Sequence, residues 1–310
     1  MGMLAVGRRR LFPWPSWFVT SDPCGLFCAF LTVCLMVFAH VVTVFLVLRG
    51  SQGLLSVHAI LFTLCTVMAL TSHCRAQFSD PGCVPKRCVP VNPPVAQAVD
   101  GNRTLLPSSI PVAKKALLPS VCRKCKTVKP RGTHHCSVCA RCISKMDHHC
   151  PWINNCVAAF NQKYFLLFLC WTGVMCIYSG CVIGVGIYRC AQSLNQCSDI
   201  SAVVVVCSML NMFEAVLFGC FVSVMLWDQL SAIFENTPYI DKLQGIKGNT
   251  THLGRMALLT EVFGERLSWR WFVPVSLPRR VQDDFYNTCD AYSQGRLDNA
   301  HDPDASDDDS

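Results

Sequence analysis

Four long apolar runs dominate the chain, and most polar residues lie between and after them. A helix needs about 20 apolar residues to cross the hydrocarbon core of a bilayer, which is roughly 30 Å thick. Only helices and closed barrels satisfy their backbone groups in lipid, and runs of this length favour helices. The pattern therefore predicts four membrane-spanning helices, at 24–48, 54–72, 164–188 and 200–227.

Polar segments of different character flank these runs. Residues 1–23 form a short N-terminal segment, and residues 73–120 form a proline-rich tether that includes Asp80-Pro81-Gly82. Prolines disfavour helix, so the tether is expected to be irregular. Residues 121–163 are rich in cysteine and histidine, and the tail, 228–310, ends in an acidic stretch. Apolar residues recur in this tail at the spacing of an amphipathic helix: Leu253, Met256, Leu259, Phe263 and Leu267.

The composition agrees with a membrane protein. Of the 310 residues, 52% are apolar and 15% are charged, whereas an ordinary soluble domain has roughly 25% charged residues. This excludes a soluble enzyme and a disordered chain as the main architecture. We expect an all-α membrane protein of four spans with a cysteine-rich domain outside the bilayer.

Positive charges indicate the orientation. Of the 27 lysines and arginines, 25 lie in the N-terminal segment, the loop between the second and third runs, and the tail. By the positive-inside rule, both termini and the cysteine-rich segment should be cytosolic. We interpret the net charge of +7 as this topology signal and expect no nucleic-acid partner.

Seven of the 22 cysteines fall within residues 122–156, together with four histidines. Because the cytosol is reducing, metal binding or catalysis is favoured over disulfides. A closed structural zinc site takes four thiolate or imidazole ligands. Two such sites would use six cysteines and two histidines, which leaves one cysteine and two histidines for another task.

Two similar tripeptides compete for that task, His134-His135-Cys136 and His148-His149-Cys150. Of their two cysteines, only Cys150 lies outside a Cys-x2-Cys pair. Asp147 and His148 precede it, so a carboxylate, an imidazole and a thiol lie within four residues, which is typical of an activated nucleophile. The alternative at this point is that Cys150 is one more metal ligand.

The full pattern resembles the Asp-His-His-Cys (DHHC) family of protein S-acyltransferases, or palmitoyltransferases. The resemblance is supported by Pro151-Trp152-Ile153-Asn154-Asn155-Cys156, Asn161-Gln162-Lys163-Tyr164-Phe165 and Asp80-Pro81-Gly82. It extends over about 45 contiguous residues, and the four-span layout agrees with it along the whole chain. The central motif is Cys122-x2-Cys125-x9-His135-Cys136-x2-Cys139-x2-Cys142-x4-Asp147-His148-His149-Cys150-x5-Cys156.

The resemblance implies a role for each of these residues. Cys150 would be the nucleophile, His148 its base and Asp147 the group that orients His148. Two structural zinc ions would be held by the other positions. The first would be bound by Cys122, Cys125, His135 and Cys142, and the second by Cys136, Cys139, His149 and Cys156.

The resemblance also implies the reaction and its partners. A fatty acyl group, palmitoyl by expectation, would pass from acyl-CoA to Cys150 and then to cysteines of membrane-associated client proteins. We expect Lys129, Arg131 and His134 to contact the cofactor phosphates. The resemblance favours the Golgi over the endoplasmic reticulum or the plasma membrane.

Several positions depart from the family pattern. Gly132 stands where an arginine is usual, Leu258 where an asparagine is usual, and Asn236-Thr237-Pro238-Tyr239 lacks the glutamate of its motif. These departures keep open a catalytically weak or inactive scaffold or adaptor built on the same zinc module. A transporter or channel is disfavoured, because the spans offer few polar residues for a pathway.

Overall fold

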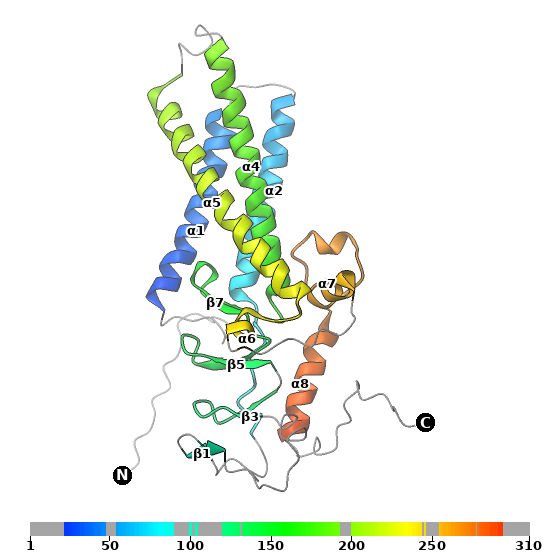
Figure 1. The fold of residues 1–310 in the computed structure, drawn as a ribbon. Coiled ribbons are helices and arrows are strands. Elements are labelled where there is room, and N and C mark those ends of the chain that lie inside the picture. Colours follow the sequence, from blue (N-terminus) through cyan, green and yellow to red (C-terminus); the bar gives the residue numbers. More distant parts are fainter. Residues whose placement is uncertain are drawn as a thin grey trace, which may run out of the picture.

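A bundle of long helices stands on a module of short β-hairpins in the computed structural model (Figure 1). The long helices are α1 (Pro23–Val41), which continues as the π-helix η1 (Val42–Val47), α2 (Leu54–Phe78), α4 (Gln162–Gln192) and α5 (Ala202–Phe234). The structure describes residues 22–47, 54–89, 99–100, 103–104, 120–130, 132–192, 200–243, 245, 254–276 and 278–293.

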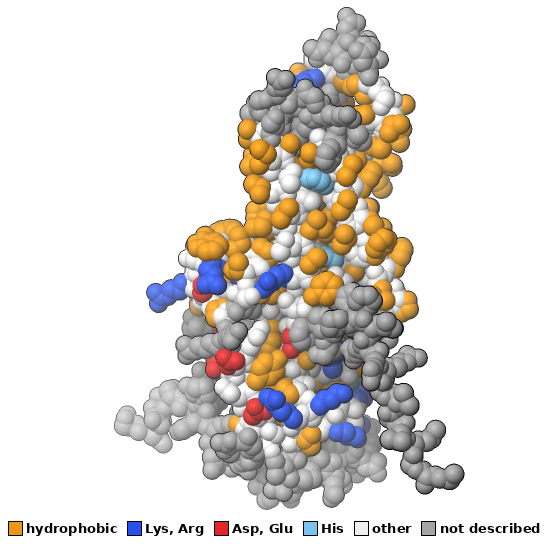
Figure 2. Space-filling model, turned by 180° about the vertical axis from the view of Figure 1, so that it is seen from behind, with side chains coloured by type: hydrophobic (Ala, Val, Ile, Leu, Met, Phe, Trp, Pro, Cys, Tyr) orange, Lys and Arg blue, Asp and Glu red, His pale blue; other side chains and the backbone are white. Residues whose placement is uncertain are grey.

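Four helices are long and apolar enough to cross a membrane, at Pro23–Val44, Val57–Phe78, Gln162–Gln192 and Ala202–Phe234. Their outward faces carry large apolar side chains, such as Phe30 and Ile177, which are 68% and 71% exposed. Such contiguous apolar surface is costly in water and stable against lipid. Figure 2 shows hydrophobic side chains over most of the helical part, with charged side chains gathered below it. The chain is a multi-pass membrane protein, as the apolar runs predicted.

Helix α2 ends at Phe78, six residues beyond the expected end of the second span at residue 72. The start of the segment that we expected to be an irregular tether is therefore helical. The amide of Asn155 donates hydrogen bonds to three carbonyl groups at the helix end, at 3.0–3.1 Å. His73 bonds the carbonyl of Trp152 at 2.9 Å. The Asn155 contacts satisfy free carbonyls at the end of α2, and the His73 contact joins the last turns of the helix to the segment after β7; a hydropathy pattern reveals neither.

The hairpin module is built from antiparallel pairs, three of which lie at 120–157, in and next to the cysteine-rich segment, whereas a fourth, at 99–104, lies in the tether that was expected to be irregular. The mostly helical fold agrees with the predicted class, and among the described residues strands occur only between α2 and α4. The pairs are β1 (Val99–Asp100) with β2 (Arg103–Thr104), β3 (Ser120–Val121) with β4 (Val128–Lys129), β5 (Thr133–Cys136) with β6 (Arg141–Ser144), and β7 (His148–Cys150) with β8 (Asn155–Val157).

The Asp80-Pro81-Gly82 motif joins α2 to this module. One carboxylate oxygen of Asp80 accepts the amide hydrogens of Gly82 and Cys83, at 2.9 and 2.8 Å. Gly82 adopts a φ of +110°, where a side chain is strained, and its carbonyl accepts a hydrogen bond from the amide of Ser144 in β6. The motif is thus a turn that carries the chain from the helix end onto the hairpin.

The tail returns to the foot of the bundle through four short elements. The predicted amphipathic helix corresponds to α7 (Arg255–Phe263), which contains Met256, Leu259 and Phe263, whereas Leu267 lies beyond its end and is exposed; Leu253 and the acidic end lie outside the described residues. The N-terminal residues 1–21 also lie outside them. The elements are α6 (Tyr239–Leu243), α7 (Arg255–Phe263), the 3-10 turn η4 (Trp269–Trp271) and α8 (Arg279–Ser293). Outside the tail, a further 3-10 turn, η2 (Pro151–Ile153), follows β7.

Candidate functional site

Two groups of cysteine and histidine side chains converge in the hairpin module. The ligand atoms of each group all lie within 4.8 Å of one another. The first cluster consists of Cys122, Cys125, His135 and Cys142, and the second cluster of Cys136, Cys139, His149 and Cys156. The structure therefore brings the eight residues together in the same two groups that the family resemblance implied.

Strand geometry explains this division. Side chains alternate between the two faces of a strand, so His135 and Cys136, which are neighbours in β5, point to different clusters. In the hairpin β7–β8, His149 lies directly opposite Cys156, and both face the second cluster. The same alternation turns His148 and Cys150 to the other face of β7.

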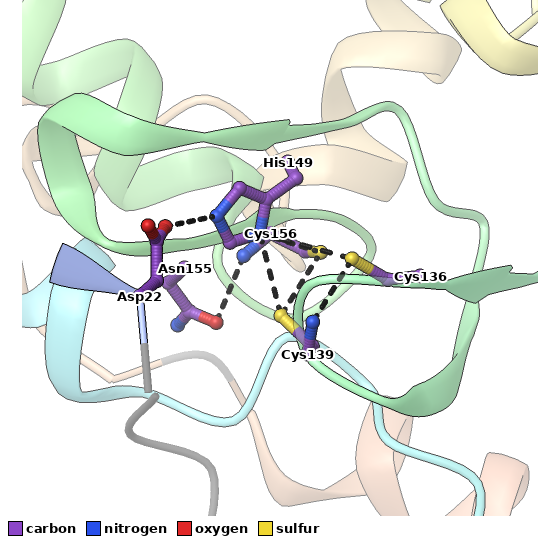
Figure 3. Close-up of polar contacts among 6 residues, drawn as sticks. All are labelled: Asp22, Cys136, Cys139, His149, Asn155 and Cys156. Atoms are coloured by element: carbon purple, nitrogen blue, oxygen red, sulfur yellow. Dashed lines mark hydrogen bonds and ion pairs between the residues drawn. The ribbon is translucent and has the colours of Figure 1, made fainter. Parts of the chain in front are cut away.

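Both clusters have the size and donor set of a tetrahedral zinc site. Zinc–sulfur and zinc–nitrogen bonds of about 2.3 and 2.0 Å in a tetrahedron separate the sulfur and nitrogen atoms by about 3.5 Å. Nδ1 of His135 lies 3.2–3.9 Å from its three sulfur atoms. Nδ1 of His149 lies 3.4–3.8 Å from those of the second cluster (Figure 3). Each cluster could hold one metal ion with four protein ligands.

A third group, separate from the first and second clusters, consists of Asp147, His148 and Cys150. Nδ1 of His148 donates to a carboxylate oxygen of Asp147 at 2.8 Å. The other ring nitrogen, Nε2, is buried and has no hydrogen-bond partner within the described residues. Cys150 is 3% exposed and lies on the same face of β7 as this ring. The imidazole is thus held by a carboxylate on one side and is available to a thiol proton on the other.

The electrostatics of the pair follow from this geometry. Burial disfavours the charged imidazolium, but the hydrogen bond to Asp147 and the charge of an ionised Cys150 outweigh it and raise the pKa of His148 to about 9. Burial alone would raise the pKa of Asp147, but hydrogen bonds from His148, the amide of Tyr239 and the side chain of Gln229 lower it. The carboxylate therefore stays ionised and favours a protonated His148.

An apolar cavity opens from Cys150 into the helix bundle. Residues of α1, α4 and α5 line it, and Trp152 lies beside Cys150 at its base. Its walls carry mostly apolar side chains, and the polar exceptions are Thr32, Thr172, Ser179, Asn211 and Glu214. The cavity connects a thiol at the foot of the bundle with an apolar interior.

The three predicted cofactor contacts have different outcomes. Arg131 lies outside the described residues. Lys129 is in β4, where it lies opposite Ser120 of β3. His134 is buried and its Nε2 lies 2.5 Å from a carboxylate oxygen of Asp241 in α6. This ring nitrogen is thus paired with a protein carboxylate, and the contact of His134 with the cofactor stays a prediction.

Sequence reasoning missed the groups that hold Asp147. Its two carboxylate oxygens accept hydrogen bonds from the amide of Tyr239 at 2.7 Å and from Gln229 at 2.6 Å. Gln229 is available because α5 runs to Phe234, past the expected end of the fourth span at residue 227. Asp241 was a further omission, because its partner His134 lies 107 residues away in the sequence.

Two departures from the family pattern have a structural explanation. Gly132 adopts a φ of +66°, in the left-handed region where an arginine would be strained. Leu258 is 7% exposed and packs with Leu166 and Ile233, so an apolar contact fixes α7 to the long helices α4 and α5. Both changes are accommodated away from Cys150 and the ligand atoms.

Comparison with known proteins agrees with this site. Residues 117–246 match the family described as DHHC palmitoyltransferase. The chain is 35% identical over 282 residues to palmitoyltransferase ZDHHC3 of Rattus norvegicus, with 89% of each chain covered. It is 34% identical over 262 residues to palmitoyltransferase ZDHHC7 of Mus musculus, covering 83% of this chain and 80% of the other. Probable protein S-acyltransferase 14 of Arabidopsis thaliana is 44% identical over 115 residues, or 36% and 38% of the two chains.

Proposed function

Because this chain belongs to the DHHC palmitoyltransferase family, we propose that it transfers a fatty acyl group from acyl-CoA, through Cys150, to client-protein cysteines. It is a protein-cysteine S-palmitoyltransferase; the acyl donor and the acyl-enzyme are the proposed parts. The clients are membrane-associated proteins whose cysteines reach the bilayer surface.

One observation carries the proposal, which is the position of Cys150. Its thiol lies beside the hydrogen-bonded pair of Asp147 and His148 and at the base of the apolar cavity. A fatty chain gains about 0.8 kcal/mol for each CH₂ group removed from water. A cavity among the spans therefore supports binding of an acyl chain whose thioester end meets Cys150.

The reaction has two balanced steps. Cys150 passes its proton to Nε2 of His148, which holds it as the imidazolium that Asp147 stabilises; the resulting Cys150 thiolate attacks the thioester carbonyl, the bond to the CoA sulfur breaks, and the imidazolium protonates the leaving CoA thiolate. A client thiol then gives its proton to His148 and attacks the new thioester, and the Cys150 thiolate leaves and is reprotonated. Asp147 keeps the ring oriented and stabilises its charged form during both steps.

The bound metal would be zinc with a structural role. The first and second clusters would each supply four protein ligands, and a zinc site closed in this way contributes folding free energy. Residues of this chain carry every proton transfer. The hairpins fix His148 and Cys150 because each is next to His149, a ligand residue of the second cluster.

The test uses full-length protein in detergent with palmitoyl-CoA, comparing wild type with Cys150→Ser. We expect the variant to lose both the thioester-linked acyl group and CoA release, while about two zinc ions per chain remain. Cys170→Ser is a matched control, because Cys170 is exposed on α4 and does not line the cavity. Equal acylation of Cys150→Ser and wild type would contradict the proposal and favour the scaffold or adaptor alternative.

The orientation is a further part of the proposal. We place both termini and the hairpin module in the cytosol, with the Golgi as the favoured compartment. The charge bias supports this orientation, as does Cys190 near the end of α4, which is disulfide-bonded and so suits an oxidising lumen. Labelling of single tags in sealed vesicles should reach both termini from the cytosolic side; lumenal labelling of either would contradict it.

A further inference from the structure

A carboxylate from the start of the first membrane helix lies against the second cluster (Figure 3). Oδ2 of Asp22 is 3.3 Å from Nε2 of His149, and both side chains are mostly buried, at 15% and 12% exposure. The opposite ring nitrogen, Nδ1, faces the three sulfur atoms. The ring thus lies between a carboxylate and the cluster.

The chemistry of a ligand histidine gives this contact a meaning. When Nδ1 offers its lone pair to a metal, the neutral ring carries its hydrogen on Nε2. A carboxylate that accepts this hydrogen fixes the tautomer and the ring angle, and makes the ring a better donor. We propose that Asp22 is a positioning residue that holds His149 as the imidazole ligand of the second cluster. The inference rests on the proposed zinc occupancy of that cluster.

The first turn of α1 supports this assignment independently. Asp22 is at the N-cap position, where an aspartate side chain usually accepts a hydrogen bond from the helix itself. Its side chain makes no such capping bond here, so the carboxylate is used by His149 instead. Gly25 is buried below it, and a methyl group there would collide with Oδ2 of Asp22 and Oδ1 of Asn154. The helix start is therefore shaped to pass close to the turn after β7.

The first cluster lacks this arrangement among the described residues. His135 also presents Nδ1 to its three sulfur atoms, but its recorded polar contacts are all with those sulfurs. The charges that act on its ring are the cations Lys124 and Lys129 and the thiol of Cys136. The carboxylate support is thus specific to the cluster whose histidine precedes Cys150. It also connects that cluster to α1, a wall of the apolar cavity.

The test measures zinc release from full-length protein in detergent after addition of a chromogenic chelator. Losing such a partner typically costs 10–100-fold in metal affinity, so we expect one of the two ions to leave Asp22→Ala about 10–100-fold faster. The ion of the first cluster should leave at the wild-type rate and serves as an internal reference. Asp22→Asn, whose amide oxygen can still accept the Nε2 hydrogen, should fall between wild type and Asp22→Ala.

The controls separate this inference from its premise. Glu261 in α7 forms an ion pair with Lys145, which is not a ligand residue of either cluster. The variant Glu261→Ala should therefore release both ions at the wild-type rate. Cobalt(II) in place of zinc should show an altered ligand-field band for one site in Asp22→Ala. Unchanged release from Asp22→Ala, or equal acceleration of both ions, would overturn the inference and leave the proposed acyl transfer intact. A wild-type chain without metal in the second cluster would overturn the proposed zinc site as well.

Discussion

The strands β5 and β7 carry the same tripeptide, His-His-Cys, and use it differently. In both, the first histidine pairs with a carboxylate, Asp241 for His134 and Asp147 for His148. In both, the second histidine belongs to a cluster. The cysteines differ: Cys136 joins the second cluster, whereas Cys150 stands outside both clusters and lines the cavity.

The surroundings of each strand decide this difference. The turn after β5 supplies Cys139, whose amide donates to the sulfur of Cys136 and keeps it among the ligands. The turn after β7 is Pro151–Ile153, which supplies no cysteine and packs against the helices. Residue types alone therefore do not separate a ligand thiol from a reactive one; the partner across the turn does.

The largest effect should come from Cys136→Ser, which tests the structural member of the pair. A hydroxyl is a poor zinc ligand, and structural zinc sites contribute on the order of 10 kcal/mol to folding. We expect about one zinc per chain, a broad low-temperature melting transition, and acyl transfer reduced to background. Metal analysis beside Cys150→Ser checks it; two zinc ions retained in Cys136→Ser would erase the distinction between the two cysteines.

The next effect concerns the two carboxylates. Asp147→Asn keeps the shape of the side chain but removes the charge that orients and stabilises protonated His148, so acyl-enzyme formation should slow about 10²–10⁴-fold. Asp241→Asn is the matched change, because Asp241 is the partner of His134 in β5. It should alter this rate by less than about 3-fold, since His134 touches no reacting atom. Rapid-mixing measurement of CoA release distinguishes them; similar rates for both variants would make the two pairs equivalent.

A pH effect on stability should also belong to β7. Because the pKa of His148 is raised to about 9 from 6.5, its protonation stabilises the fold fully below pH 6.5, and this contribution is lost as the pH rises through about 9. A pKa shift of this size corresponds to about 3 kcal/mol of folding free energy. The melting temperature of wild type should therefore exceed that of His148→Gln by several degrees more at pH 7 than at pH 10. A constant difference would show that this proton is not coupled to folding.

The smallest effect is expected on the melting temperature, when the contact between His134 in β5 and Asp241 in α6 is weakened. Removing the charge of Asp241 leaves a buried imidazole with a weaker partner, which costs about 1–3 kcal/mol, or a few degrees in melting temperature. Glu261→Gln, in an exposed pair with Lys145, should change it by less than about 1 kcal/mol. Equal shifts in the two variants would mean that the His134–Asp241 contact adds nothing specific.

Local patterns explain how far the sequence could be interpreted. The four apolar runs predicted the spans, because hydropathy is a property of neighbouring residues. They missed the polar extensions of α2 and α5, since the polar groups of His73 and Gln229 are satisfied by Trp152 and Asp147, which are distant in the sequence. The Cys-x2-Cys spacings and the family resemblance grouped the ligands. Asp22 and Asp241 could not be found in this way, because their partners are 127 and 107 residues away.

The length of α4 has a consequence for where the reaction occurs. Its 31 residues span about 46 Å at 1.5 Å per residue, whereas the hydrocarbon layer is roughly 30 Å thick. The lower end of α4 follows β8 after only a short turn, so this rigid helix sets the height of Cys150 relative to the lipid boundary. Bilayers of different thickness will place that boundary at different levels along α4. The Cys150 thiol would thus lie at a different depth in bilayers of different thickness, so that bilayer thickness would help to select the cysteines that it can reach.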